Sequence, residues 1–299
     1  MIGGADGSAR PGGRPSRLAA VVLYGGAAAA ALVAPRLSRR VGRRVAPGVA
    51  DTVVLSGLAV TGWAVIAAAE RIRPFREDWN RSRGDVMTDA LDFVVVGSFS
   101  QGLAHLVTAP LQSAVAEKRG TGPLARLPLP ARVAVMTVAF DFGHTTIHRM
   151  LHEKGALWRF HAPHHSPLRL YWGNASRFHP IDSVVDLIQE AFVLSALRAD
   201  REALLAYRVF RGLYGQIQHC NVDLDSGPLN AVLATPERHR WHHSSNPGEG
   251  NSNYGATVSV WDRVLGTDAL PDRPFDAAIG NGDPDYPTDF LGQLAAPFR

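Results

Sequence analysis

Residues 148–165 of this chain read HRMLHEKGALWRFHAPHH, and this stretch decides how the rest of the sequence is interpreted. It opens with an HxxxH pattern at His148 and His152 and closes with an HxxHH pattern that begins at His161. Residues three or four apart lie on one face of an α-helix. We therefore expect each pattern to present its imidazole rings on one side of a helix. Pro163 predicts that the second helix begins near His161, because proline is tolerated in a first turn.

The HxxHH pattern returns at residues 239–243, which read HRWHH. The Thr-Pro-Glu sequence at 235–237 predicts a helix there, because it combines a capping residue, a proline at the first helical position and an acid in the first turn. Of the 12 histidines in the chain, 11 lie between His144 and His243, whereas histidines that serve only solubility would be scattered.

Clustered histidines of this kind indicate metal binding, because imidazole is a neutral ligand that suits iron, zinc and copper. One ion takes roughly four to six ligands, and an enzyme leaves at least one position open. The patterned histidines exceed the needs of one ion and suit two. They are His148, His152, His161, His164, His165, His239, His242 and His243.

Four histidines stand outside these patterns. His219 and His179 are candidates either for ligands or for groups that orient ligands. His144 lies one helical turn before the HxxxH pattern and is a weaker candidate. His105 falls within an apolar run, and we interpret it as a packed or pore-lining polar residue.

Four apolar runs precede the histidine-rich segment or lead into it, at 18–34, 49–69, 90–113 and 131–147. A helix that crosses a bilayer needs roughly 20 predominantly apolar residues. Two of the runs reach that length with almost no charge, which favours membrane spans. The alternative, buried helices of a soluble protein, is compatible with the near-neutral mean hydropathy. After these runs, 184–197 and 203–217 predict helices in or on the membrane, and 251–267 predicts a loop or short extended segment.

The net charge of +4 comes from arginines that flank the apolar runs, at 36–44 and 71–83. This placement is typical of membrane-proximal charge, and it argues against nucleic acid as a partner. If 71–83 is cytoplasmic, the runs at 90–113 and 131–147 form a hairpin that returns His148 to the cytoplasmic side. The 36–44 arginines then lie on the opposite side if run 49–69 spans, and the sequence leaves the topology of the first two runs open.

Cys220 is the single cysteine, which excludes an intramolecular disulfide and any CxxC zinc or iron–sulfur site. A chain without disulfides agrees with an active site that faces the reducing cytosol. No flavin, nicotinamide or haem motif is evident, so we expect electrons for any redox reaction to come from a separate protein.

The order of these elements resembles the fatty acid hydroxylase superfamily, also called the sterol desaturase family. The resemblance covers about 130 residues, 141–268. It is carried by Asp141, HRMLH at 148–152, LWRFHAPHHS at 157–166, RFHP at 177–180, QHCN at 218–221, TPERHRWHHS at 235–244, NYG at 253–255 and WDRVLGT at 261–267.

The resemblance implies an all-α fold, a multi-span transmembrane helical bundle with a cytosolic, histidine-rich helical cap that holds a dimetal site. It divides the chain into a disordered basic tail (1–17), a transmembrane helical region (18–140), a catalytic domain (141–268) and a C-terminal tail (269–299). The implied ligands are the eight patterned histidines, with His219 as a ninth and His179 in a family-like position. Asp141 and Asn221 are implied to orient imidazole rings in the catalytic site.

The function implied by the resemblance is hydroxylation or desaturation of a C–H bond in a sterol or fatty-acyl lipid. Two iron ions would be the cofactor, O2 the co-substrate, and a ferredoxin or cytochrome b5-type protein the electron donor. The enzyme would be integral to the cell membrane, with its active site facing the cytoplasm. Two other readings stay open: a zinc-dependent membrane hydrolase that uses Glu153 or Glu237, although HExxH is absent, and a non-catalytic metal-binding membrane protein.

Overall fold

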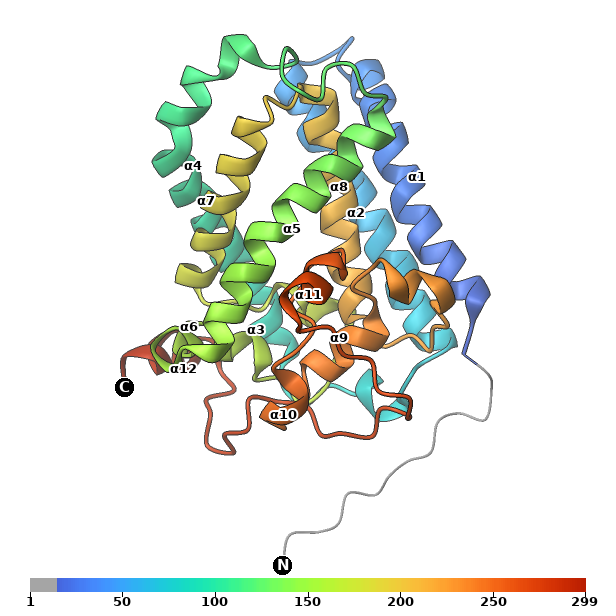
Figure 1. Ribbon diagram of the computed structural model, residues 1–299, viewed down its shortest axis with the longest axis vertical. Helices are drawn as coiled ribbons and strands as arrows, with labels where there is room; N and C mark the ends of the chain where they lie inside the picture. Colours follow the sequence, from blue (N-terminus) through green and yellow to red (C-terminus); the bar gives the residue numbers. More distant parts are fainter. Residues whose placement is uncertain (1–14) are drawn as a thin grey trace, which may run out of the picture.

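The computed structural model describes residues 15–299, and this part of the chain is all helical, with isolated β-bridges but no strand. Its long helices lie side by side in a bundle (Figure 1). They are α1 (Arg17–Val41), α2 (Pro47–Ile72), α4 (Gly97–Ala114), α5 (Leu129–Glu153), α7 (Pro180–Ala196) and α8 (Arg201–His219). Most of the predicted basic tail, residues 1–14, lies outside the described residues, and Arg17 already begins α1.

Shorter helices gather at one end of the bundle with the loops that join them, and we call this part the cap (Figure 1). It contains α6 (Gly155–His165), α9 (Pro236–His242), α10 (Pro247–Gly250), α11 (Val260–Leu265) and α12 (Phe290–Ala295). Single turns of 3₁₀-helix occur at Glu77–Asn80, Ala116–Lys118, Trp172–Ser176, Gly227–Ala231 and Ala296–Phe298. At the junction of cap and bundle, α3 (Val86–Leu91) continues through a π-helical turn, Asp92–Val96, into α4.

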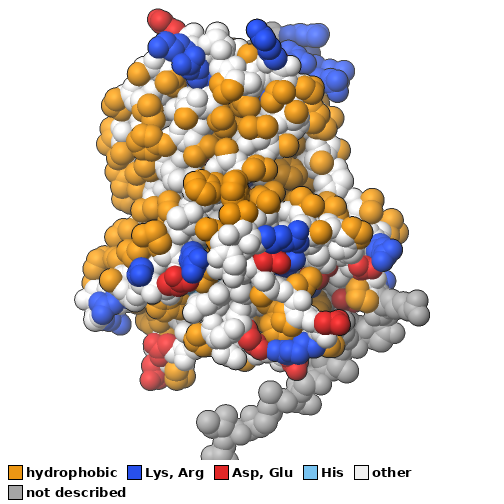
Figure 2. Space-filling view, in the orientation of Figure 1, with side chains coloured by type: hydrophobic (Ala, Val, Ile, Leu, Met, Phe, Trp, Pro, Cys, Tyr) orange, Lys and Arg blue, Asp and Glu red, His pale blue; other side chains and the backbone are white. Residues whose placement is uncertain are grey.

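Three helical segments are long and apolar enough to cross a membrane: α1, α2 and the continuous segment Val86–Ala114. In α2 only 11% of the most apolar stretch is buried by the rest of the described protein, so this helix presents its apolar side chains outward. Figure 2 shows the resulting hydrophobic surface around the bundle, with charged side chains at its end and over the cap. The expectation of membrane spans is therefore confirmed over buried helices of a soluble protein.

The fourth predicted run forms α5, but α5 is not among the helices apolar enough to span by composition. It carries Asp141, His144, His148 and His152 on its lower half, and these polar side chains lower its hydropathy. The predicted helices at 184–197 and 203–217 are α7 and α8, and both are part of the bundle.

The first two runs form a hairpin. α1 begins at the cap, where the N–H of Ser16 donates to the carbonyl of Asp223 at 3.0 Å, and α2 ends there. The turn between them lies at the opposite end of the bundle (Figure 1). The arginines at 36–44 and those at 71–83 are thus at opposite ends, and His148 is at the same end as 71–83.

The alanine-rich sequence of α1 is explained by its partner. Ala20, Ala27, Ala31 and Ala34 are all buried and belong to one apolar cluster with residues of α8 such as Leu213. Small side chains let two helix backbones approach closely, which is how helices associate where lipid removes the hydrophobic driving force.

Two local predictions were wrong. α6 begins at Gly155, directly after the turn at Lys154, so Pro163 lies near the end of the helix and not in its first turn. The proline forfeits a single backbone hydrogen bond, which an eleven-residue helix with buried neighbours tolerates. The second wrong prediction concerns residues 251–267, expected to be a loop or short extended segment. The first part is a loop in which Val258 forms a bridge to Leu233, but Val260–Leu265 is helical.

Candidate metal centre

Nine of the ten histidines expected at the metal site meet at the junction of bundle and cap. They come from α5 and α8 of the bundle and from α6, α9 and the residue after α9 in the cap. They form two groups, and within each group the ligand atoms all lie within 4.8 Å of one another. The first group is His148, His152, His161, His165 and His242, and the second is His164, His219, His239 and His243. All nine side chains are buried except that of His152, which is half-buried.

Each HxxHH pattern divides its rings between the two groups. His164 and His165 are adjacent in sequence but belong to different groups, and the same holds for His242 and His243. The groups adjoin through stacked rings, with the centroids of His165 and His243 4.2 Å apart. The three rings of one HxxHH pattern therefore do not all belong to one group. Each pattern contributes rings to both groups.

Backbone and side-chain acceptors hold the ring orientation in the first group. The Nδ1 of His148 donates to the carbonyl of Tyr254 at 2.8 Å, and the Nδ1 of His161 donates to Asp182 at 2.7 Å. The Nδ1 of His242 donates to the carbonyl of Ser252 at 2.8 Å. Since these oxygens only accept, the proton of each neutral ring sits on Nδ1 and the lone pair on Nε2.

The second group has the same design. The Nδ1 of His164 donates to the carbonyl of Arg177 at 3.1 Å. The Nδ1 of His219 donates to the side-chain oxygen of Asn174 at 3.1 Å. The amide nitrogen of Asn174 donates to the carbonyl of Arg169 at 2.6 Å, which fixes that oxygen toward the histidine. Again the Nε2 lone pairs are left for the inside of the group.

In His148 and His161, which both donate through Nδ1, the Nε2 lone pairs face one another with no proton between them. The Nε2 atoms of His148 and His161 are 2.9 Å apart, and those of His219 and His239 are 2.8 Å apart. The Nε2 of His242 is buried without a hydrogen-bond partner. Opposed lone pairs in a dry interior repel, and a buried nitrogen without a partner is costly, so the donor set fits a cation in each group.

The electrostatics of the cap keep the rings in the ligand form. Burial lowers the pKa of His242 to about 3. Burial and the neighbouring imidazoles hold the pKa of His165 and His243 well below the ordinary value. Neutral imidazole is the form that binds metals, so these rings are ready to bind at neutral pH.

Comparison with known proteins agrees with this site. Residues 133–267 match the family described as fatty acid hydroxylase. The ornithine lipid hydroxylase OlsE of Rhizobium tropici is 35% identical over 241 residues, which cover 79% of this chain and 72% of that protein. The chain belongs to the fatty acid hydroxylase family. Its resemblance to that family, and with it the expectation of an oxidoreductase, is thereby confirmed.

Two other relatives match a shorter part of this chain. Alkylglycerol monooxygenase of Caenorhabditis elegans is 32% identical over 131 residues, 42% of this chain and 25% of that protein. Methylsterol monooxygenase 1 of Rattus norvegicus is 32% identical over 141 residues, 46% of each chain. The chain thus spans a quarter to a half of these two relatives, and no solved structure matches it.

His179, the tenth histidine expected at the metal site, lies outside both groups. It caps α7: its Nδ1 accepts from the N–H of Ile181 at 3.2 Å, and its Nε2 donates to the carbonyl of Leu294 at 3.3 Å. His144 is also outside, with its Nδ1 2.7 Å from Asp186, and His105 is exposed on α4.

Asp141 and Asn221 do not touch the ligand rings. Asp141 is buried and accepts from the backbone N–H groups of Thr257 and Val258, so it holds the loop before α11. Asn221 accepts from the N–H of Arg76 at 3.0 Å and donates to the Arg76 carbonyl at 2.8 Å, so it ties two cap segments together. Both act on the backbone around the site, and the orienting role expected for them belongs to other residues.

Asp182 and Asn174 hold that role, and sequence reasoning missed them. Neither lies in a histidine pattern, and each is brought to its ring by packing of a separate element: Asp182 from the first turn of α7, Asn174 from a 3₁₀ turn. The only available signal was a carboxylate placed three residues after His179 in the family-like step.

The two carboxylates considered for a hydrolase are engaged elsewhere. Glu153 accepts from Arg149 at 2.7 Å, and Glu237 accepts from the N–H and hydroxyl of Ser226 at 2.7 and 2.9 Å. Neither belongs to the two ligand groups. The two carboxylates on which the hydrolase hypothesis depends are therefore not positioned as the general base that such an enzyme uses.

Proposed function

We propose that the protein is a membrane-bound di-iron oxygenase that hydroxylates an unactivated C–H bond of a lipid with O2. The observation that carries the proposal is the pair of adjoining all-imidazole groups, five rings in one and four in the other. Imidazole suits iron, and two neighbouring ions can share the electrons that O2 reduction needs. When bound, the iron pair supplies the redox chemistry that the side chains of the cap cannot perform.

The residues of the chain position and shield that chemistry. His148, His152, His161, His164, His165, His219, His239, His242 and His243 would hold the irons. Asp182 and Asn174 keep their rings in the required tautomer. Phe178 stacks on His164 with centroids 4.3 Å apart, and Trp158 packs 5.1 Å from His152. These aromatic rings exclude water and leave an apolar surround suited to an aliphatic chain.

A lipid substrate follows from where the centre lies. The helices that carry the histidine groups meet at the cap end of a bundle whose visible side is apolar (Figures 1 and 2), which supports a substrate with an aliphatic chain that enters from the bilayer. All three relatives described above carry the name hydroxylase or monooxygenase, which favours hydroxylation over desaturation. The match to ornithine lipid hydroxylase covers 241 residues and extends beyond the family segment 133–267, so amino-acid-containing lipids are the first class to assay.

The electrons are proposed to come from a separate donor protein of the ferredoxin or cytochrome b5 type at the cytoplasmic face. The cap carries arginines of the 71–83 stretch, among which Arg81 and Arg83 are exposed. A positively charged surface steers an acidic donor toward it. With such a donor, the cap is proposed to face the cytoplasm.

The test is the metal content of detergent-purified full-length protein from iron-supplied cells. We expect about two irons per chain, and loss of iron in His164→Ala and in His165→Ala, which remove one ligand from each group. His179→Ala is the matched control, because His179 is buried nearby but lies outside both groups, and it keeps its iron. One tightly held zinc with no iron, even after anaerobic reconstitution, overturns the proposal.

The reaction is tested by lipid profiling. If the protein binds two irons, lipid extracts of cells with the wild-type protein are expected to gain a hydroxylated product that the His164→Ala strain lacks.

A further inference from the structure

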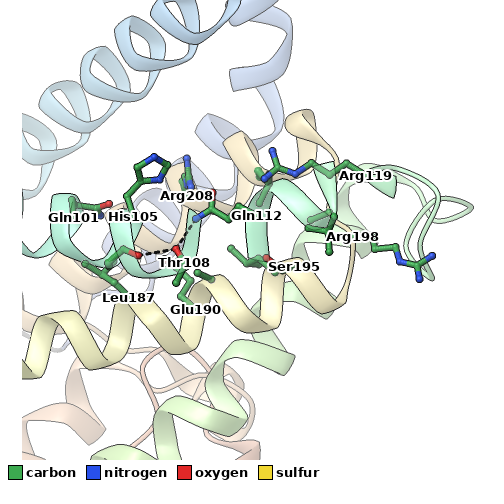
Figure 3. Close-up of a pocket in the computed structure, with 16 residues that line it drawn as sticks. Gln101, His105, Thr108, Gln112, Arg119, Leu187, Glu190, Ser195, Arg198 and Arg208 are labelled. Carbon is green, nitrogen blue, oxygen red and sulfur yellow. Dashed lines mark hydrogen bonds between the residues drawn. The ribbon is translucent and has the colours of Figure 1, made fainter. Parts of the chain in front are cut away.

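A polar pocket lies in the bundle, away from the cap, between α4, α7 and α8 (Figure 3). Its volume is about 100 Å³. α4 contributes Gln101, His105 and Thr108 to the wall, and α7 contributes Glu190. α4 is part of a membrane-spanning segment and carries exposed Leu106 beside these polar groups. Polar side chains at membrane depth are expensive and indicate a bound polar partner.

The charge of the pocket is positive. Arg119, Arg198 and Arg208 line it, and none of their guanidinium groups is paired with a carboxylate among the described residues. The one acid in the wall, Glu190, already faces Arg211 at 3.5 Å. Arg208 is seven residues into α8, roughly 10 Å below the end of the bundle at 1.5 Å per residue. All three arginines are exposed in the described protein, so their guanidinium groups are free to bind an anion that enters from the lipid side.

The outer rim of the pocket is built by two turns that lock together. The N–H of Gly120 donates to the carbonyl of Arg198 at 2.9 Å. Gly120 has a φ of +75° and Arg198 a φ of +50°, a conformation that non-glycine residues seldom adopt. A Cβ on Gly122 would approach the Leu197 carbonyl to 2.6 Å, so the two turns are in close contact. This contact brings Arg119 and Arg198, which belong to the two turns, together at the pocket.

We propose that this pocket binds the anionic headgroup of a phospholipid in the leaflet opposite the cap. Arg119 and Arg198, beyond the ends of α4 and α7, lie at the level of the phosphate layer, and Arg208 and His105 line the wall toward the interior (Figure 3). Guanidinium groups form strong charge-assisted hydrogen bonds with phosphate oxygens. The acyl chains lie along the exposed apolar side of α4, at Leu106. This site is distinct from the metal centre and does not rest on the proposed function.

The test measures thermal unfolding of the purified full-length protein in neutral detergent with three additives: phosphatidylglycerol, phosphatidylcholine and inorganic phosphate. Phosphatidylglycerol is expected to raise the melting temperature, and the other two are not. The double variant Arg198→Gln/Arg208→Gln requires roughly tenfold more phosphatidylglycerol for the same shift, because two charge-assisted contacts are lost. Arg126→Gln is the matched control, since Arg126 is exposed in the same loop as Arg119 but does not line the pocket.

An equal shift with phosphatidylcholine overturns the proposal, because the site would then not select an anion. An equal shift with inorganic phosphate overturns the lipid source and leaves a site for a free anion. A double variant that responds as the wild type does overturns the assignment of these arginines. The melting temperature of the double variant without additives serves as a check of folding, because the pocket is separate from the histidine groups, and it stays at the wild-type value.

Discussion

Replacing Asp182 by asparagine tests whether the rings are held for metal binding. Asp182 is buried and accepts from the Nδ1 of His161 at 2.7 Å, which keeps the lone pair of that ring on Nε2. An asparagine side chain can turn its N–H₂ toward Nδ1, which would move the ring proton to Nε2 and block the ligand atom. It also removes a negative charge from beside a cationic centre.

The expected magnitude follows from the role of such a group. Loss of an orienting carboxylate typically weakens metal binding about 10- to 100-fold, which is about 1.4 to 2.7 kcal/mol. The assay is iron retained by the full-length protein during titration with a chelator, for wild type, Asp182→Asn and Asp182→Ala. The variants are expected to release iron at roughly tenfold or more lower chelator concentration, with the alanine variant at least as weak.

Asp186→Asn provides the matched control. Asp186 lies one turn further along α7 and is also 2.7 Å from a histidine Nδ1, but that histidine is His144, which is outside both groups. The control loses a similar histidine bond and also the ion pair between Asp186 and Arg211, but it does not contact a ligand ring. It is therefore expected to lower stability while keeping iron at the wild-type chelator concentration. Equal iron retention by Asp182→Asn and the wild type would refute the reasoning.

Three further predictions address the cap. Gly255→Ala should give little folded protein, because the alanine Cβ would overlap the carbonyl oxygen of Val258. Overpacking of this kind costs about 1–3 kcal/mol or more. A wild-type yield and melting temperature would contradict this. Asp141→Ala should lower stability by about 1–3 kcal/mol, because the oxygen that accepts from the backbone N–H groups of Thr257 and Val258 is lost and those groups are left buried without a partner. Thermal unfolding measures this, and the iron content per folded chain should stay unchanged. Metal-free protein should lose stability as the pH falls below about 6.5, because the unfolded chain takes up protons that buried His242, with its pKa near 3, does not. Each such histidine contributes up to about 1.4 kcal/mol per pH unit; a melting temperature of chelator-treated protein that is constant between pH 7.5 and 5.5 would contradict this origin.

The sequence by itself determined which histidines gather at the site and the class of fold. Three histidine patterns lie within a hundred residues, and their spacing already identified the eight rings that later fall into the two groups. Apolar runs of bilayer length likewise determined the membrane spans, because hydrogen bonding within a helix is the local solution to a medium without water. These features depend on residues close together in the chain, so local patterns reveal them.

Only the tertiary structure decided how the rings are shared and what orients them. His219 joins the site from the end of α8, while His179, which looks equivalent in sequence, caps α7 instead. Asp182 and Asn174 reach their histidines across 21 and 45 residues of chain. The direction of the first hairpin also depends on the packing of α1 against α8. Such contacts join segments distant in sequence, and no local period encodes which face of one helix will meet which ring of another.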